Sequence, residues 1–377
     1  MKKRKIGINA SFLRKLNTGI GQVTRNALND LKNRIEGDSF ILYLEDKAGL
    51  SLPDNFEEKA FLPFWKRDDL IRKILWEKFS LPKKVTEDNC ESFISLYQCP
   101  TILGKNIKHT MVVHDIIPKL FPEYLNNWRK KLYWKLTEQA IKRADRIIAV
   151  SESTKIDLVE KLKISEEKIE VSHVDVDDIY KAEVSSEKSK EVLDKYDLSP
   201  GYIYSGGGLE KRKNIDKVIF AYNELRKSGV RLPKLVISGK MMPELAPLVT
   251  DVAGLVKDYE LEADVRLLDF VSQEDLPAIY KNALFFVYPS EYEGFGMPVL
   301  EAMNQGIPVI AARNSSIAEV GGDAVVYFET ENIDEMSRKI EDMVSNEELR
   351  VELSKKEKER ARMFSWESFV GNLIGEK

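Results

Sequence analysis

Cysteine and histidine are scarce in this sequence. It has 2 cysteines, Cys90 and Cys99, and 3 histidines among 377 residues. Two cysteines cannot form the disulfide framework of a small secreted scaffold, and with so few histidines they match no zinc-binding spacing. The scarcity excludes a disulfide-stapled or zinc-held fold and favours a reducing compartment, the cytoplasm. No metal or other cofactor is expected.

Long hydrophobic runs are also lacking. Nowhere do about 18 to 20 uncharged apolar residues follow one another, as a membrane-spanning helix requires. Near the start only the run Ile6–Ala10 is apolar before Arg14 and Lys15. That run is too short for the core of a secretory signal and predicts a first strand instead. No tract is biased enough to indicate disorder, so the chain is expected to be globular.

The charge is small in sum but unevenly distributed. Residues 1–180 contain 32 Lys and Arg against 27 Asp and Glu, whereas residues 181–377 contain 26 against 35. A basic half favours contact with an anionic surface or acceptor, although ordinary solvated charge explains the imbalance as well. Nucleic acid is not expected as a partner.

Short apolar runs alternate with amphipathic stretches along the whole chain. The runs show little polar alternation, which is typical of strands buried on both faces of a parallel sheet. We expect strands at Lys5–Asn9, Phe40–Leu44, Ser92–Leu96, Thr110–Val113, Arg146–Val150, Tyr202–Tyr204, Lys234–Ser238, Val265–Leu268, Ala283–Tyr288, Pro308–Ala311 and Ala324–Phe328.

The length of the chain predicts two domains. A polar stretch, Asp175–Pro200, separates the two sets of expected strands, and we place the hinge near residues 177–190. The predicted fold is α/β, with two Rossmann-like doubly wound parallel-sheet domains over residues 1–180 and 181–360. Ligands of such sheets bind beyond the carboxyl ends of strands, so the loops there are the places to search for chemistry.

The strongest functional signal is the stretch ALFFVYPSEYEGFGMPVLEAMNQGIPVIA, residues 283–311. An apolar strand is followed by a loop with Gly294 and Gly296, and Pro298 then stands where a helix would begin, because proline suits the first helical turn. The free amides at the start of that helix, together with its dipole, favour a phosphate, and glycine lets the phosphate approach the backbone.

Two carboxylates flank this predicted phosphate site. Glu293 precedes the helix, and Glu301 lies within its first turn or so. Carboxylates beside a phosphate are favourable if they accept hydrogen bonds from ribose or hexose hydroxyls. The combination indicates a sugar nucleotide. The alternative is that Glu301 only improves the start of the helix and that Glu293 is solvated.

A second signal is YIYSGGGLEKRKNIDKVIFAYNEL, residues 202–225. A strand is followed by three glycines, Gly206–Gly208, and then by the basic cluster Lys211–Lys213. Glycines allow close approach to the backbone, and the cations could neutralise a diphosphate leaving group. The third glycine of the dinucleotide fingerprint is missing, which disfavours a nicotinamide oxidoreductase. The alternative is a flexible turn with ordinary surface lysines.

A third signal is the pair His114 and Asp115, which follows the expected strand Thr110–Val113. A histidine there could donate to a sugar hydroxyl or stabilise developing charge, and the aspartate could orient it or receive an acceptor proton. A simple hydrogen bond within the loop is the more common explanation for such a pair.

Two weaker features follow other strands. Gly19 and Gly21 are expected between the first strand and the first helix, either as a tight turn or as backbone amides near the diphosphate or the acceptor. Ser151 follows the strand Arg146–Val150 and is interpreted as a helix N-cap.

The segment Trp128–Arg146 carries 7 Lys and Arg interleaved with Trp128, Tyr133 and Trp134. Basic residues among aromatics suit an anionic membrane surface or a lipid-phosphate acceptor. An ordinary surface helix with its aromatic residues in the core is the favoured explanation. The alternative is a peripheral contact with the inner face of the cytoplasmic membrane.

Taken together, these segments resemble the retaining glycosyltransferases of family 4, which have the GT-B fold. EGFGMPVLE is similar to the E-x7-E motif of that family, with Glu293 and Glu301 as its acids. The resemblance covers nearly the whole chain, because seven segments fall in the order of the family: GINASFLRKLNTGIGQVTRN, VVHDIIPKLFPEY, AVSESTKIDL, GGLEKRKNIDKVI, PSEYEGFGMPVLEAM, SSIAEVGGDA and FSWESF.

The resemblance implies a donor in a cleft that the two domains face. It places Glu301 on the ribose, Glu293 on the donor hexose, and Lys213 with Arg212 on the diphosphate. His114 is implied to contact the far hydroxyl of the donor sugar. By this resemblance the catalytic set is His114, Lys213, Arg212 and Glu293.

The resemblance implies further contacts by backbone and by the base-binding loop. The backbone of Phe295, Gly296, Met297 and Val299 would hold the sugar and phosphates. Residues 270–276, with Val271, are similar to the segment that lines the base. FSW at residues 364–366 resembles the start of a last helix, within residues 361–377, that returns to the N-terminal domain.

One position departs from the pattern of the family. Many members have an arginine where Gly207 stands, and a glycine cannot contact a phosphate through a side chain. Relatives similar to bacterial surface-polysaccharide mannosyltransferases also lack that arginine, which favours GDP-mannose as donor over a UDP-sugar. No carboxylate is assignable as a covalent nucleophile, so we expect the acceptor to attack from the face that the leaving diphosphate vacates.

The sequence therefore predicts a hexosyltransferase that moves mannose to a glycan or lipid-linked acceptor in surface polysaccharide synthesis. Two alternatives on the same fold stay open: a non-catalytic protein that binds sugar nucleotides, and an isomerase or phosphorylase. Cations on the protein are expected to take the place of a metal.

Overall fold

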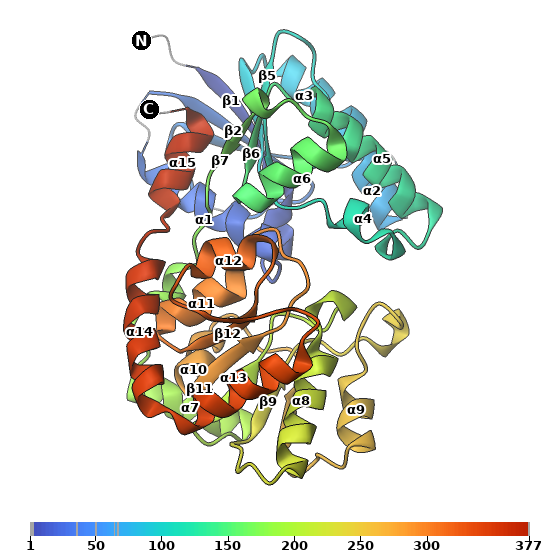
Figure 1. Ribbon diagram of the computed structural model, residues 1–377. Coiled ribbons are helices and arrows are strands. Elements are labelled where there is room, and N and C mark those ends of the chain that lie inside the picture. The colour runs from blue at the N-terminus through green and yellow to red at the C-terminus, as the bar shows by residue number, and fades with distance from the viewer. Residues whose placement is uncertain (1–3, 35–36, 50, 64, 66–67, 376–377) are drawn as a thin grey trace. The chain divides into compact units, whose positions relative to one another are not determined.

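A computed structural model describes residues 4–34, 37–49, 51–63, 65 and 68–375. The chain divides into two compact units (Figure 1). The first comprises Met1–Asp175 with Ser365–Lys377, and the second comprises Val176–Phe364. The last two residues of the predicted C-terminal segment lie outside the described residues. Within the described ranges no helix is both long and apolar enough to cross a lipid bilayer.

The first unit is built around a seven-stranded parallel sheet with the order β3-β2-β1-β4-β5-β6-β7. Its strands are β1 (Lys5–Asn9), β2 (Ser39–Leu44), β3 (Phe56–Ala60), β4 (Ser92–Ser95), β5 (Lys108–Val113), β6 (Arg146–Ala149) and β7 (Ile169–Val171). Strand β1 is central, since Ile6 pairs with Phe40 on one side and with Ser92 on the other.

Helices surround this sheet. They are α1 (Gly19–Arg34), α2 (Asp69–Leu75), α3 (Leu81–Glu87), α4 (Ile117–Leu120), α5 (Trp128–Arg143), α6 (Glu152–Leu162) and α15 (Trp366–Ile374), with a π-helical turn at Trp76–Ser80 and short 3-10 turns at Ser11–Lys15, Pro122–Tyr124 and Glu166–Lys168. Helix α15 packs against α1. The Arg146 guanidinium donates to the carbonyl of Asn372 at 2.6 Å, which fixes the end of α15.

The second unit has a six-stranded parallel sheet with the order β10-β9-β8-β11-β12-β13. Its strands are β8 (Tyr202–Ser205), β9 (Leu235–Ser238), β10 (Val265–Leu268), β11 (Ala283–Tyr288), β12 (Val309–Ala312) and β13 (Val326–Phe328). Because β8 and β11 are neighbours, the loops after them meet at one edge of the sheet.

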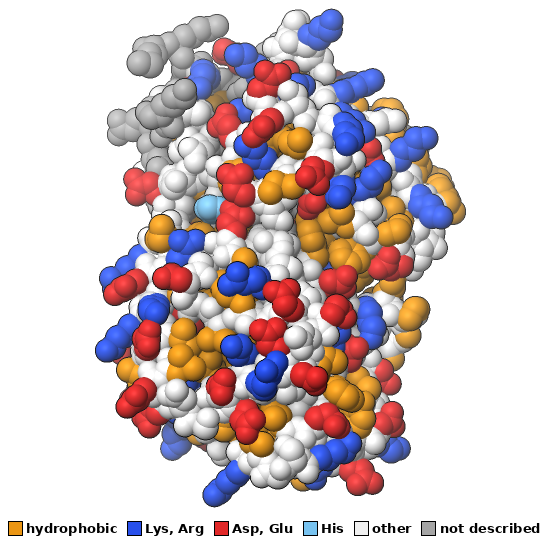
Figure 2. Space-filling model, in the orientation of Figure 1, with side chains coloured by type: hydrophobic (Ala, Val, Ile, Leu, Met, Phe, Trp, Pro, Cys, Tyr) orange, Lys and Arg blue, Asp and Glu red, His pale blue; other side chains and the backbone are white. Residues whose placement is uncertain are grey.

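The helices of the second unit are α7 (Ser186–Tyr196), α8 (Ile215–Lys227), α9 (Val252–Asp258), α10 (Leu276–Lys281), α11 (Met297–Gln305), α12 (Ser315–Gly321), α13 (Ile333–Ser345) and α14 (Glu347–Ala361), with 3-10 turns at Asp178–Tyr180, Lys211–Lys213 and Pro243–Leu245. Lys and Arg side chains alternate with Asp and Glu over the visible face of this unit (Figure 2).

The prediction of two doubly wound parallel sheets is confirmed. All eleven expected strands form, and Ser151 caps α6 by accepting from the Thr154 amide at 3.0 Å. The sequence missed β3, an edge strand of residues FEEKA in which only Phe56 is buried, and the three-residue β7. Part of the stretch near residues 177–190, where we place the hinge, is helical. Helix α7 begins at Ser186, capped by Ser185 and anchored by buried Val192.

Candidate active site

The loop after β8 packs onto the loop after β11. The Asn214 side chain donates to the Pro289 carbonyl at 3.1 Å, and Asn214 itself has a φ of 52°. The Glu291 amide donates to the Arg212 carbonyl at 2.7 Å, and the Arg212 guanidinium donates to the Tyr292 carbonyl at 2.8 Å. These reciprocal bonds bring together two stretches of chain that are about eighty residues apart.

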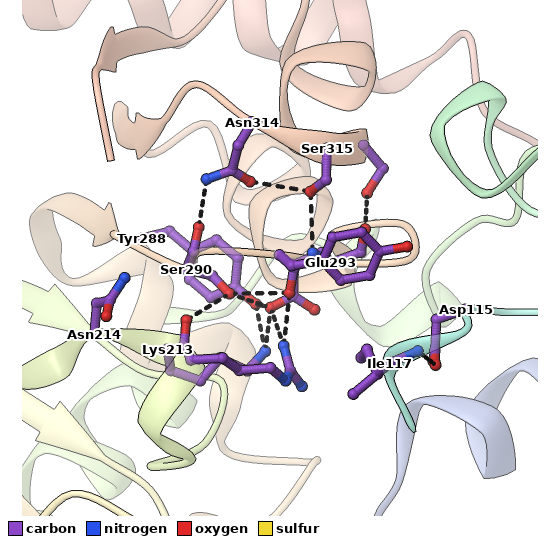
Figure 3. A network of polar contacts seen from close by, with 12 residues as sticks. Asp115, Ile117, Lys213, Asn214, Tyr288, Ser290, Glu293, Asn314 and Ser315 are labelled. Atoms are coloured by element: carbon purple, nitrogen blue, oxygen red, sulfur yellow. Dashed lines mark hydrogen bonds and ion pairs between the residues drawn. The ribbon is translucent and has the colours of Figure 1, made fainter. Parts of the chain in front are cut away.

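Glu293 is the centre of a dense polar cluster (Figure 3). Its Oε1 atom accepts from Lys213 Nζ at 2.5 Å, Arg212 at 2.8 Å, the Tyr288 hydroxyl at 2.8 Å and the Ser290 hydroxyl at 2.5 Å. Lys213 also donates to the Tyr288 hydroxyl at 2.7 Å. Both members of the Lys213–Glu293 pair are buried. The alternative of a solvated Glu293 is therefore wrong.

The charges of this cluster determine its ionisation. Burial alone would raise the pKa of Glu293, but Lys213 and Arg212 outweigh burial and lower that pKa to about 2. Burial and the neighbouring Arg212 lower the pKa of Lys213, and Glu293 opposes this shift. Glu293 is ionised at any ordinary pH, and two cations face one carboxylate. An anionic ligand beside the cluster would raise the pKa of Lys213 again.

Helix α11 begins directly after this loop. Gly296 stands before it with a φ of 104°, and Pro298 lies in the first turn. The helix starts at Met297, one residue before Pro298, where the sequence predicts its beginning. The Val299 amide donates to the Gly296 carbonyl at 3.0 Å, so it is occupied by the helix itself. Amides of a first helical turn generally lack an intrahelical acceptor and favour an anion.

Helix α12 holds the glycine-containing loop from the other side. The Glu293 amide donates to the Ser315 hydroxyl at 3.0 Å, and the Ser316 hydroxyl donates to the Glu293 carbonyl at 2.8 Å. The Asn314 side chain donates to the Ser290 carbonyl at 2.8 Å. Phe295 is buried, and its ring meets that of Phe364 edge to face at 5.7 Å.

Gly207 has a physical reason to be glycine. Its φ is 96°, a conformation in which a side chain is strained. An added Cβ would lie 3.0 Å from Pro298 Cγ and 3.1 Å from a ring carbon of Tyr288. The backbone at Gly207 therefore packs directly against the start of α11, and an arginine would require a different loop.

Glu301 lies on the second turn of α11, and tyrosine side chains from outside this helix contact it. Its Oε2 atom accepts from the Tyr280 hydroxyl at 3.0 Å, and only 7% of the residue is exposed. Burial raises the pKa of Glu301 to about 7, although the hydroxyls of Tyr280 and Tyr180 act in the opposite direction. Glu301 does more than improve the start of a helix, because it is buried and accepts from a tyrosine outside that helix.

The segment expected to line a base follows β10. Val271 is buried, whereas half of Phe270 is exposed. The Tyr180 hydroxyl donates to Gln273 at 2.9 Å, so this segment and Glu301 share a neighbour.

In the first unit, His114 follows β5 as predicted and is buried. Burial lowers its pKa to about 4, against the effect of the Leu96 carbonyl, so the ring is neutral at pH 7. Its Nε2 atom lies 2.9 Å from the Leu96 carbonyl and must carry the proton of that hydrogen bond. Nδ1 is then an acceptor. We therefore no longer expect His114 to donate to a sugar hydroxyl. Its Nδ1 atom is expected to accept a hydrogen bond from that hydroxyl instead.

Asp115 and the two early glycines have local structural roles. Asp115 Oδ1 accepts from the Ile117 amide at 2.9 Å at the start of α4. Gly19 and Gly21 lie in the first turn of α1 and not in the loop before it, which corrects the prediction. The Gly21 amide donates to the Thr18 hydroxyl at 3.1 Å, and an added Cβ at Gly21 would lie 2.0 Å from the Lys15 carbonyl oxygen.

The second unit thus brings Arg212, Lys213 and Glu293 together next to the start of α11. Sequence reasoning missed two members of the cluster, Tyr288 and Ser290. Their only signal was position, since they flank the end of a buried strand that leads into the loop. Among the described residues no group of three or more His, Cys, Asp or Glu side chains could hold a metal ion.

Comparison with known proteins identifies both halves of the chain. Residues 186–360 match the family described as "Glycosyl transferases group 1", and residues 53–178 match the one described as "Glycosyltransferase Family 4". O-antigen chain mannosyltransferase B of Escherichia coli is 33% identical over 264 residues, which cover 69% of this chain and 68% of that protein.

Two further proteins are similar over different lengths. The serotype-specific mannosyltransferase WbdA of E. coli is 31% identical over 264 residues, covering 69% of this chain but only 32% of WbdA, so the match spans about a third of that protein. A crystal structure of a glycosyltransferase from Rickettsia africae superposes over 100% of both chains with a TM-score of 0.72 at 17% identity, which shows the fold. The chain belongs to glycosyltransferase family 4, a family of retaining hexosyltransferases with the GT-B fold.

Proposed function

We propose that this enzyme moves a mannosyl group from GDP-mannose to a glycan or lipid-linked acceptor in surface polysaccharide synthesis. The similarity to O-antigen mannosyltransferases supports the choice of sugar. The observation that carries the proposal is the buried cluster in which Lys213 and Arg212 meet Glu293 beside the start of α11. Such an arrangement suits a diphosphate and a sugar at adjacent positions.

In this proposal the two domains bind different substrates. Residues 181–360 bind the donor, residues 1–180 bind the acceptor, and residues 361–377 return the chain to the N-terminal domain. In the donor domain Glu301 accepts from the ribose, Val271 lies along the base, and Lys213 and Arg212 bind the diphosphate. The backbone of residues 295–299 surrounds the sugar and phosphates, with the Met297 amide favoured over that of Val299.

The cations carry the chemical step in this proposal. As the glycosidic C–O bond breaks, negative charge develops on the diphosphate oxygen, and Lys213, Arg212 and the first-turn amides of α11 stabilise it. The acceptor hydroxyl attacks from the face that the diphosphate leaves and gives its proton to the departing diphosphate oxygen, so the anomeric configuration is retained. Glu293 orients the hexose through its hydroxyls while holding both cations in place. His114 accepts from a sugar hydroxyl through Nδ1.

A donor panel with product analysis tests this function. We would incubate the enzyme with GDP-mannose, UDP-glucose and UDP-galactose in turn, with octyl α-mannoside as acceptor, and determine the anomeric configuration of the product by NMR. The expected result is an α-mannosyl product from GDP-mannose. Preferential use of a UDP-sugar would overturn the choice of donor, and a β-linked product would overturn the mechanism.

The pKa of Glu301 predicts how donor binding depends on pH. Only the ionised carboxylate accepts from two ribose hydroxyls, so KM for the donor should rise up to about tenfold per pH unit below pH 7. Glu301→Gln should have a high KM with a flat profile between pH 5 and 8. A flat profile in the unmodified enzyme would contradict this role.

The raised pKa of Glu301 also makes the stability of the native state depend on pH, in the opposite direction to donor binding. Because the folded pKa of Glu301 lies above its ordinary value, protonation stabilises the native state, fully so below that ordinary value. This contribution is lost as the pH rises through about 7. Donor binding and stability should therefore respond to pH in opposite directions.

The proposal includes a peripheral membrane contact through Trp128–Arg146. Trp134 is buried, whereas Trp128 is 66% exposed and Lys131 and Lys135 are exposed on the same helix. Arg129 is instead paired with Asp68. The exposed part of α5 combines an aromatic side chain with exposed basic groups, which suits the headgroup region of an anionic bilayer.

Charge reversal tests this contact. Lys131→Glu with Lys135→Glu should weaken binding to phosphatidylglycerol vesicles at least about tenfold, since each basic residue contributes about 1 kcal/mol near such a surface. The matched control is Lys105→Glu with Lys108→Glu, two exposed lysines in the turn before β5 and at its first residue. Equal vesicle binding by the two variants would show that α5 is an ordinary surface helix and not a membrane contact.

A further inference from the structure

The second unit has a cavity of about 570 Å³ at the opposite end of α11 from the candidate active site. Asn304 and Gln305 line it from the end of that helix, and the α14 residues Lys358 and Arg362 line it from another side. Neither Lys213 nor Glu293 lines this cavity, so it is distinct from the cluster that surrounds Glu293.

The charge of the cavity is unlike that of its surroundings. Its lining includes four cations, Lys181, Lys281, Lys358 and Arg362, and one acid, Glu183. Residues 181–377 as a whole contain 26 basic against 35 acidic residues. Among the described residues, an ion pair neutralises only one of these four cations. Lys181 pairs with Asp178 at 3.3 Å, but no ion pair holds Lys281, Lys358 or Arg362 in the described part of the chain.

We propose that this cavity is a binding site for a soluble polyanion, a small molecule that carries at least two phosphate groups. Like charges that line one hollow repel one another, and an anion that bridges them removes this repulsion. Lysine and arginine side chains donate without accepting, which matches the acceptor-only oxygens of a phosphate. The volume of the cavity is in the range of small-molecule sites.

The walls of the cavity connect it to the donor-binding elements. The Gln305 side chain donates to the Tyr180 carbonyl at 2.6 Å, and the hydroxyl of Tyr180 bonds Gln273 in the segment beyond β10. Phe364, which also lines the cavity, packs on Phe295 in the loop before α11. A bound polyanion would therefore restrain elements that reach the candidate donor site.

The cavity also lies where the chain enters and leaves the second unit. Residues 181–184 come soon after the chain enters this unit at Val176, and residues 361–364 are the last before it leaves after Phe364. A ligand in contact with both segments would link the two connections between the units. We therefore assign the site a regulatory role. The regulatory role rests on the proposed function, whereas the binding of a polyanion does not.

Calorimetry with inorganic tripolyphosphate tests the site, with GDP present at saturation to occupy the donor site. The intact enzyme should bind one tripolyphosphate under these conditions. Lys281→Glu with Lys358→Glu should weaken this binding at least tenfold. The matched control Lys257→Glu with Lys355→Glu changes the charge equally at exposed positions outside the cavity and should bind as the intact enzyme does. Donor hydrolysis is measured in parallel, so a failed donor assignment is told apart from a failed cavity assignment.

Hydrogen exchange locates the ligand. Tripolyphosphate should slow exchange in peptides that cover residues 181–184 and 361–364, in the intact enzyme and in the control variant alike. Absence of binding in the presence of GDP, equal binding by both double variants, or protection confined to other segments would each overturn the proposal. Loss of phosphatidylglycerol vesicle binding in Lys281→Glu with Lys358→Glu, without tripolyphosphate binding to the intact enzyme, would assign the cations to a lipid surface instead.

Discussion

Lys213→Ala should lower the rate of sugar transfer by about 10² to 10³, the usual effect of removing one fixed donor from the charge that develops in a transition state. Lys213 Nζ lies in a buried position, 2.5 Å from Glu293 and 2.7 Å from the Tyr288 hydroxyl. Its location is therefore set before any substrate binds, and water cannot take its place. The measurement is kcat with saturating donor.

The matched control is Lys211→Ala. Lys211 belongs to the same 3-10 turn, but 59% of its side chain is exposed and it pairs with Asp216 at 2.8 Å. Its removal should change kcat less than about twofold, because exposed ion pairs contribute little. If the two variants had the same kcat, the leaving group would not be stabilised by Lys213.

Glu293→Ala should have the largest effect on stability and a large one on activity. Removing one partner of a buried ion pair leaves the other charge uncompensated, which costs about 3 to 5 kcal/mol. Here Lys213 would keep Arg212 as a neighbour and lose the carboxylate that opposes the lowering of its pKa. Thermal unfolding should show a clearly lower Tm, and transfer should fall because the hexose and both cations lose their anchor.

A double variant separates the two effects. Lys213→Met combined with Glu293→Gln removes both buried charges, so most of the lost stability should return while transfer stays low. Glu291→Gln, at the exposed acid two residues earlier, serves as control and should leave both unchanged. A double variant as unstable as Glu293→Ala would show that packing rather than charge pairing holds this loop.

Much of the fold could be predicted because each strand carries its own signal. The runs that form β11 and β12 are apolar, and both strands lie inside a parallel sheet that buries them on both faces. Strand β3 gave no such signal, since Phe56–Ala60 is an edge strand with three charged residues and only Phe56 buried. Helix α7 was not predicted because most of its residues are polar. Only two of its side chains, Val192 and Leu193, are buried.

The candidate site was predictable where neighbours in sequence are also neighbours in space. Gly296 and Pro298 indicated the start of α11 because turn and cap chemistry is local. The partners of Glu293 were not predictable in the same way. Glu293 and Lys213 are 80 residues apart, and only the pairing of β8 with β11 brings them together. The tautomer of His114 likewise depends on the carbonyl of Leu96, which follows strand β4.

Equilibrium binding of nucleotides tests the central claim most directly, because it needs no acceptor. The claim is that Lys213 and Arg212 in the second unit hold the diphosphate of the donor. Calorimetry would compare GDP with GMP for the intact enzyme, Lys213→Ala and Lys211→Ala. The intact enzyme and Lys211→Ala should prefer GDP at least about tenfold, since a charged hydrogen bond contributes about 1.5 to 3 kcal/mol. Lys213→Ala should lose most of this preference. If Lys213→Ala kept the full preference for GDP, the diphosphate would bind elsewhere and the account would be contradicted.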